Sequence, residues 1–120
     1  MGDEAETICP VNSAVKNSVV TTFHQDSPVL PPDMLHSVWC AVNRKTKCGI
    51  LLDRSEAVSV YDALKSVTIN AAYQYGEEKI KGTIEPGKDA SFVILSGNPL
   101  CCDKNRINEI EIEYTVLRDE

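Results

Sequence analysis

The fold class depends on residues 18–29, which read Ser18-Val19-Val20-Thr21-Thr22-Phe23-His24-Gln25-Asp26-Ser27-Pro28-Val29. The run is rich in apolar and β-branched side chains, which is typical of a buried strand. It ends at Asp26, and Pro28 disfavours regular pairing beyond that point. Reactive groups collect at the carboxyl ends of strands in parallel α/β architectures, so we predict that this strand carries the Asp26 carboxylate into a loop with a chemical role.

Helices are predicted on both sides of this strand. Cys9-Pro10 opens a short helix within residues 8–17, because proline suits the first turn, and Asp33 caps a second helix. Helix, strand and helix in this order indicate a wound α/β sheet. We expect the sheet to be covered by one apolar face of the second helix, which consists of Met34, Leu35, Val38, Trp39 and Val42.

The second helix is expected to close at Gly49, after a group of basic residues that its carboxyl end tolerates. The clearest helix begins at Ser59, whose hydroxyl forms a capping box with Asp62. Its apolar positions continue at helical spacing, and we expect it to run without interruption until Gly76 stops it.

The chain changes character after Gly76. Pro86-Gly87 suits the two central positions of a type II turn. A short strand is predicted at residues 92–95, and residues 107–117 alternate as a half-exposed strand does. These glycine-punctuated strands predict a small β unit joined to an α/β piece.

The composition is that of one modest domain. The 120 residues are too few for a complete eight-stranded barrel, which takes about 250. The formal charge of -6 offers no positive field to nucleic acid, and no apolar run approaches the roughly 20 residues that cross a bilayer. The acidic amino end and the odd count of five cysteines predict a cytoplasmic protein in a reducing compartment, without nucleic-acid or membrane partners.

Three segments carry a resemblance when they are taken together in order. They are His24–Val29, the helical segment Ser59–Tyr75 with its Thr68-Ile69-Asn70-Ala71-Ala72, and Lys81–Lys88 leading into Phe92–Leu95. From about Cys9 to Leu117 the chain resembles the carboxyl-terminal part of the metal-dependent amidohydrolase superfamily, in the branch called amidohydrolase family 3. The resemblance implies the last β/α units of a (β/α)8 TIM-type barrel over residues 8–76, followed over residues 77–120 by strands of a small composite β-sandwich.

The resemblance also implies a role for Asp26. In the family, the acid that ends the eighth strand helps to hold a divalent metal, for which we expect zinc, and accepts a proton from the bound water. Asp26 matches that position and is therefore expected to be a metal ligand and a general base. The family's other ligands are mostly histidines, and this chain has only His24 and His36. We therefore expect the chain alone to hold no metal and to be inactive.

Simpler interpretations stand beside these expectations. Asp26 before Ser-Pro also suits a turn. His24 lies two positions before Asp26, on the same face of the predicted strand, so it either approaches the same metal or bonds a neighbour. For several other side chains packing or solvation is favoured over chemistry, and these are His36, Trp39, Cys101, Cys102, Glu109, Glu111 and Glu113.

Two functions from different classes follow. The first is a carboxyl-terminal piece of a hydrolase acting on carbon–nitrogen bonds other than peptide bonds. Because an unclosed barrel leaves strand edges and apolar helix faces open, this piece would associate with itself or with a complementing amino-terminal amidohydrolase chain. The alternative is a small non-catalytic interaction or scaffold domain derived from such an enzyme.

Overall fold

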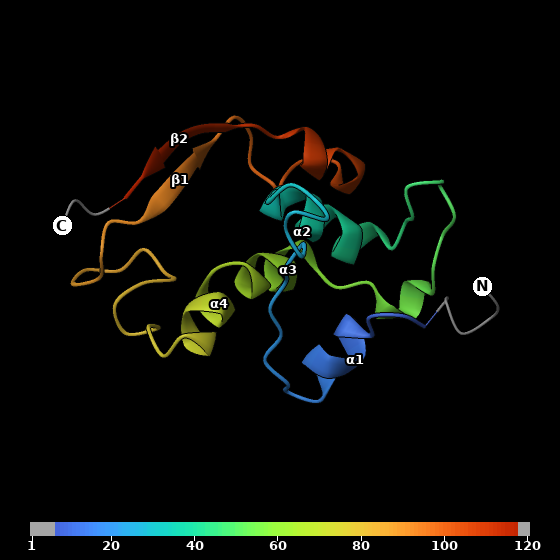
Figure 1. Cartoon of the computed structure of the whole chain (residues 1–120), viewed down its shortest axis with the longest axis horizontal. Coiled ribbons are helices and arrows are strands. Elements are labelled where there is room, and N and C mark those ends of the chain that lie inside the picture. The colour runs from blue at the N-terminus through green and yellow to red at the C-terminus, as the bar shows by residue number, and fades with distance from the viewer. Residues whose placement is uncertain (1–6, 118–120) are drawn as a thin grey trace.

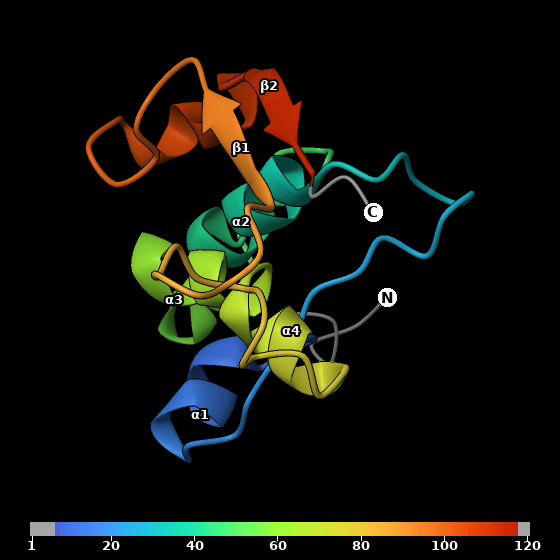
Figure 2. The ribbon, with the colours of Figure 1, turned by 90° about the vertical axis from the view of Figure 1, so that its left-hand side faces the viewer.

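The computed structural model of the chain describes residues 7–117, which form a mixed α/β arrangement with one small sheet (Figure 1). The sheet and the first helix lie at opposite ends of the molecule, with the other helices between them (Figure 2). Within the described residues, no helix has the length and apolar character needed to cross a membrane. The elements in chain order are α1 (Val11–Lys16), α2 (Met34–Asn43), η2 (Arg54–Glu56), α3 (Val60–Ser66), α4 (Ile69–Gln74), β1 (Phe92–Leu95), η3 (Lys104–Glu109) and β2 (Ile112–Val116).

The predicted strand within residues 18–29 is not formed. Helix α1 follows Pro10 and ends at Asn17 as expected. The chain then runs uncoiled from Val19 to Gln25, but no strand is assigned there. The physical reason is pairing: the described residues contain only β1 and β2 as strands, and these pair with each other. Val19 and Val20 are consequently 56% and 52% exposed instead of buried.

Helix α2 begins as predicted but ends earlier. The Asp33 carboxylate accepts a hydrogen bond of 3.0 Å from the His36 amide, which confirms the cap. The helix ends at Arg44, which adopts the left-handed conformation with φ of 52°, so the predicted closure at Gly49 is wrong. The Arg44 guanidinium is buried and donates to the carbonyl oxygens of Ile8, Cys9 and Asp53. These bonds explain why a charged residue ends the helix inside the protein.

The apolar core lies between α2, α3 and η3. Its centre consists of Val38, Ala63 and Ile107, each with no exposed surface. The apolar face of α2 therefore covers other helices, and the expectation that it covers a sheet is wrong for the described residues. The predicted strand within residues 107–117 begins only at Ile112, because residues 104–109 form the 3-10 helix η3 that delivers Ile107 to the core.

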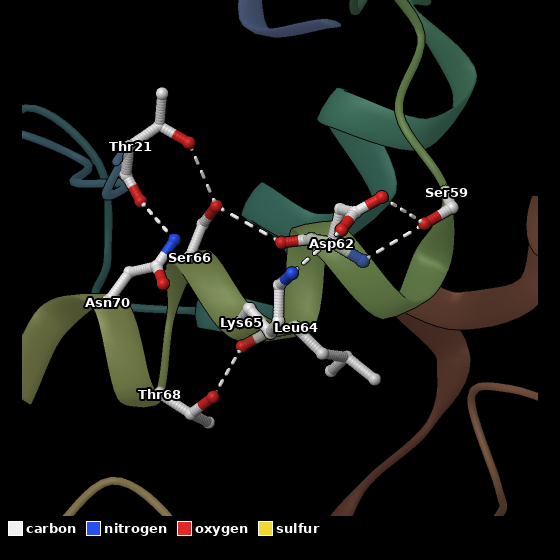
Figure 3. Close-up of polar contacts among 8 residues, drawn as sticks. All are labelled: Thr21, Ser59, Asp62, Leu64, Lys65, Ser66, Thr68 and Asn70. Carbon is white, nitrogen blue, oxygen red and sulfur yellow. Dashed lines mark hydrogen bonds and ion pairs between the residues drawn. The ribbon is translucent and has the colours of Figure 1, made fainter. Parts of the chain in front are cut away.

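The predicted helix from Ser59 to Gly76 is broken in two. Ser59 caps α3 as expected, since its Oγ accepts from the Asp62 amide at 3.0 Å and donates to the Asp62 carboxylate at 2.7 Å (Figure 3). The break falls at Thr68, whose φ and ψ of -126° and -98° are not helical. The Thr68 hydroxyl donates to the Leu64 carbonyl at 2.7 Å, and such back-bonding is known to bend helices. Gly76, with φ of 72°, ends α4 as predicted.

The β unit is an antiparallel pair. Strand β1 lies where it was predicted and pairs with β2, for example Ile94 with Tyr114. The turn at Pro86-Gly87 is confirmed by the bond from the Lys88 amide to the Glu85 carbonyl and by φ of 91° at Gly87. Most of the side chains on both strands are exposed. The sheet therefore has open faces as well as open edges.

A glycine substitution tests the packing of the β unit on α4. In Gly82→Ala the new Cβ would lie 2.8 Å from the Ala72 Cβ at a φ of +94°, whereas in Gly87→Ala it would meet nothing within 4 Å at a φ of +91°. Gly87→Ala should lower the unfolding free energy by about 1–2 kcal/mol through backbone strain alone. Gly82→Ala should lower it by about 2–4 kcal/mol, since overpacking adds to that strain. Urea unfolding of the two variants measures the difference, and equal losses would contradict the close approach.

The loss of unfolding free energy at acid pH tests the contact between α1 and η2. The amide and hydroxyl of Ser13 donate to the Glu56 carboxylate, and these bonds lower the pKa of Glu56 below its ordinary 4.5. The stabilisation is therefore present above pH 4.5 and is lost as the pH falls through the lowered pKa. In Glu56→Gln the unfolding free energy, measured by urea unfolding at several pH values, should fall less steeply as the pH is lowered. Glu111→Gln, an exposed control, should leave the loss unchanged; an equal flattening by both variants would contradict the assignment.

Candidate functional site

Asp26 lies at the start of an exposed turn. Its φ is 53°, and its carbonyl accepts a hydrogen bond of 2.8 Å from the Val29 amide. The turn covers residues 26–29, and Ser27 extends it by donating from its hydroxyl to the Leu30 carbonyl at 2.9 Å. The interpretation of Asp26 as a turn residue is confirmed. The residue is exposed, so the turn presents it at the surface of the described protein.

The residue that positions this turn is Gln25, which sequence reasoning missed. Its Oε1 accepts from the Asp33 amide at 2.7 Å, and its Nε2 donates to the Asp33 carbonyl and, at 2.9 Å, to the Ser37 hydroxyl. These bonds tie the chain just before Asp26 to the first turn of α2. Glutamine has no positional signature of this kind in a sequence, so only its place between His24 and Asp26 could have drawn attention to it.

An apolar groove of about 650 Å³ lies beside the turn, between the amino-terminal residues, the uncoiled run Val19–Gln25 and α2. Its apolar walls include Ile8, Phe23, Leu30 and Leu52, and His24 lines it as well. Asp26 is not among the lining residues. Because the predicted strand is absent, the alternation that would put His24 and Asp26 on one strand face does not apply.

His36 and Cys40 also line the groove. The His36 Nε2 lies 3.6 Å from the Cys40 Sγ, and the His36 ring stacks on Trp39 with centroids 5.8 Å apart. Burial raises the pKa of the Cys40 thiol, and the neighbouring Asp33 carboxylate adds to the effect. The thiol is therefore protonated near pH 7, and a protonated thiol is a weak nucleophile and a poor metal ligand.

The other flagged side chains have structural surroundings. Trp39 donates from Nε1 to the Asn105 carbonyl at 2.9 Å and packs on the core, which confirms its packing role. Cys102 also packs on the core, and the five cysteines are all free. Glu109 pairs with Arg106 at 2.8 Å on the exposed surface, so its carboxylate is solvated.

The described residues do not by themselves fit a catalytic metal. Over residues 7–117 no group of three histidine, cysteine, aspartate or glutamate side chains is placed to hold an ion. Catalytic zinc usually has three protein ligands. No such group of three includes Asp26 within the described residues, so a complete metal centre at Asp26 would need side chains from outside them.

Comparisons with known proteins extend over almost the whole chain. The model of the Amidohydrolase family matches residues 3–120. The chain is 31% identical over 98% of its length to YtcJ of Bacillus subtilis (strain 168), which is named as an amidohydrolase. It is 32% identical over 90% of its length to the N-substituted formamide deformylase of Arthrobacter pascens, and 37% identical over 72% to Protein LONG AFTER FAR-RED 3 of Arabidopsis thaliana. No solved structure matches.

The coverage of these relatives is partial. The matched part is 23% of YtcJ, 20% of the deformylase and 15% of the Arabidopsis protein. The chain therefore spans about a fifth of the length of the curated relatives that it matches. On the family match over residues 3–120, supported by relatives at 31%, 32% and 37% identity, this chain belongs to the Amidohydrolase family.

Proposed function

We propose that this chain is the carboxyl-terminal part of a metal-dependent hydrolase acting on carbon–nitrogen bonds other than peptide bonds, and that it is inactive alone. The observation that carries the proposal is the family match over residues 3–120 combined with a span of only about a fifth of the relatives. Over residues 7–117 no group of three ligand side chains is assembled, so the proposal assigns the remaining metal ligands to another part of the enzyme.

Asp26 is the residue that this part contributes to the chemistry. It lies exposed on a turn that Gln25 fixes to α2, so its backbone position is defined while its carboxylate remains accessible. A bound divalent metal such as zinc would lower the pKa of an attacking water. In the complete enzyme the Asp26 carboxylate would be one ligand of such a metal and would act as the general base that accepts a proton from the attacking water. The remaining ligands come from the amino-terminal part.

The two parts of the chain belong to different domains in this proposal. Residues 8–76 belong to the end of a barrel, and residues 77–120 belong to a composite β-sandwich. The open faces of β1 and β2 support the second assignment, because a two-stranded sheet is marginal without a further layer. A complementing amino-terminal amidohydrolase chain would supply that layer and the missing barrel strands.

The five free cysteines are consistent with the cytoplasm as the compartment.

A complementation assay tests the proposal. The 120-residue chain is assayed alone, and again after co-expression with the part of the Arthrobacter pascens deformylase that lies outside the matched region. The substrate is an N-substituted formamide, and zinc is measured in each preparation. We expect neither turnover nor stoichiometric zinc in the chain alone, and both in the combined preparation. Stoichiometric zinc with turnover by the chain alone would contradict inactivity. A monodisperse, metal-free chain that gains no activity would favour the interaction-domain alternative.

Asp26→Asn tests the assigned residue. In the combined preparation we expect turnover to fall by about 100-fold or more, as for loss of a general base. Asp33→Asn is the matched control: it makes the same change at the far end of the same loop, where asparagine caps a helix equally well. Asp33→Asn should retain turnover close to that of the unaltered preparation. Equal turnover in both variants would remove Asp26 from the chemistry.

A further inference from the structure

A basic pocket lies at the carboxyl end of α2, where segments distant in sequence meet. Its volume is about 360 Å³, and its lining comes from the end of α2, the loop that follows, η2 and η3. The charged residues of this lining are Lys45, Arg54 and Lys104, and no acidic residue of the described chain is among them. A concave site whose charged groups are all cations concentrates anions.

Hydrogen bonds fix the segments around the basic pocket to one another. Residues 44–52 fold back on themselves through an antiparallel bridge. At the base of this hairpin the Arg44 guanidinium donates to the carbonyl of Asp53, directly before η2. The Asn43 side-chain amide donates to the Lys104 carbonyl at 2.9 Å, which holds the start of η3 beside α2 (Figure 1). The walls of the pocket are therefore built by specific contacts.

The three cations of the pocket are not neutralised by neighbouring acids. Within residues 7–117 the ion pairs are made by other basic side chains, and the side chains of Lys45, Arg54 and Lys104 donate no hydrogen bond there. The adjacent acids Asp53 and Asp103 cap their own helices, each accepting from the amide two residues further on at 2.8 and 2.9 Å. Neither acid lines the pocket, so the lining keeps three positive charges.

The helix end alone does not explain this cluster. The carboxyl end of a helix favours a nearby positive charge, which accounts for Lys45. Arg54 and Lys104 come from η2 and η3, and like charges gathered in one pocket repel one another. A bound dianion relieves that repulsion. Phosphate suits the set, because an arginine pairs with two phosphate oxygens at once and a lysine adds a point charge.

The pocket has room for more than the phosphate group itself. Cavities of about 300 Å³ and above are typical of small-molecule sites, and Leu51 and Asn105 complete the lining with apolar and amide surface. The formal charge of -6 on the whole chain opposes binding to an extended anionic surface, such as nucleic acid or an anionic membrane. A small soluble ligand fits both observations.

We infer that Lys45, Arg54 and Lys104 form a binding site for the phosphate group of a small soluble organic phosphate. The site is separate from the turn at Asp26, which Gln25 holds at the amino end of α2. The ten residues of α2 lie between the two, a length of about 15 Å. Binding in the basic pocket does not depend on the proposed hydrolysis, since Asp26 does not line this pocket.

Titration calorimetry of the 120-residue chain with phenyl phosphate tests the site at low ionic strength and near neutral pH. Benzoate is the matched ligand, since it has the same ring and a single charge. We expect phenyl phosphate to bind one-to-one and about tenfold more tightly than benzoate, because a phosphate monoester carries nearly twice the charge. Absence of binding, or equal affinity for benzoate, would overturn the site.

Substitutions locate the binding. Arg54→Gln and Lys104→Gln should each weaken binding of phenyl phosphate by about tenfold, as the loss of a charged hydrogen bond does. Lys47→Gln is the matched control: it removes the same charge from the same hairpin, at a residue that does not line the pocket. It should change the affinity by less than about twofold. All three side chains are exposed, so urea unfolding should be unchanged in each variant.

Equal weakening by Lys47→Gln and by the two pocket variants would reduce the effect to overall charge and overturn the site. Vesicles of phosphatidylcholine with phosphatidic acid present a phosphate monoester on a lipid surface instead. We expect no sedimentation of the chain with these vesicles. Sedimentation without binding of phenyl phosphate would overturn the assignment to a soluble ligand.

Discussion

Hydrogen bonding of the backbone is the constraint on which this structure depends. Helices satisfy their own amides and carbonyls, so α1 to α4 form wherever their caps and apolar spacing allow. Strands need a neighbour, and the only paired strands within residues 7–117 are β1 and β2. The run Val19–Gln25 has the composition of a strand and the position of a strand, but its pairing partners are absent. The run consequently stays uncoiled beside the groove.

Local signals predicted the parts of the fold that local interactions decide. Asp33 and Ser59 cap their helices as expected, and Pro86-Gly87 forms its turn, because each acts through bonds to residues close in sequence. Predictions failed where distant residues decide the outcome. Ile107 reads as part of a strand, but its burial against α2 and α3 places it in a 3-10 helix. The end of α2 at Arg44 depends on carbonyls of residues 8, 9 and 53, which no local pattern reveals.

The features of the candidate site also separate into those that local sequence predicted and those that depend on contacts between distant residues. The match of residues 24–29 to a family motif identified Asp26, and its turn geometry followed from Asp before Ser-Pro. The expectation that His24 shares a face with Asp26 required a strand, and so it failed with the strand. Gln25 went unnoticed because its importance lies in contacts with Asp33 and Ser37, which only the folded loop brings together.

The buried guanidinium at the end of α2 limits which sequences this fold tolerates. Arg44 joins the first described residues to the end of α2 and to the segment before η2 through three separate N–H groups at fixed angles. A lysine would retain the positive charge, but a single ammonium at the end of a flexible stem cannot reach three carbonyls in these directions. The position is therefore selected by shape and by the number of donors. Relatives that replace this arginine must rebuild the junction of all three segments together.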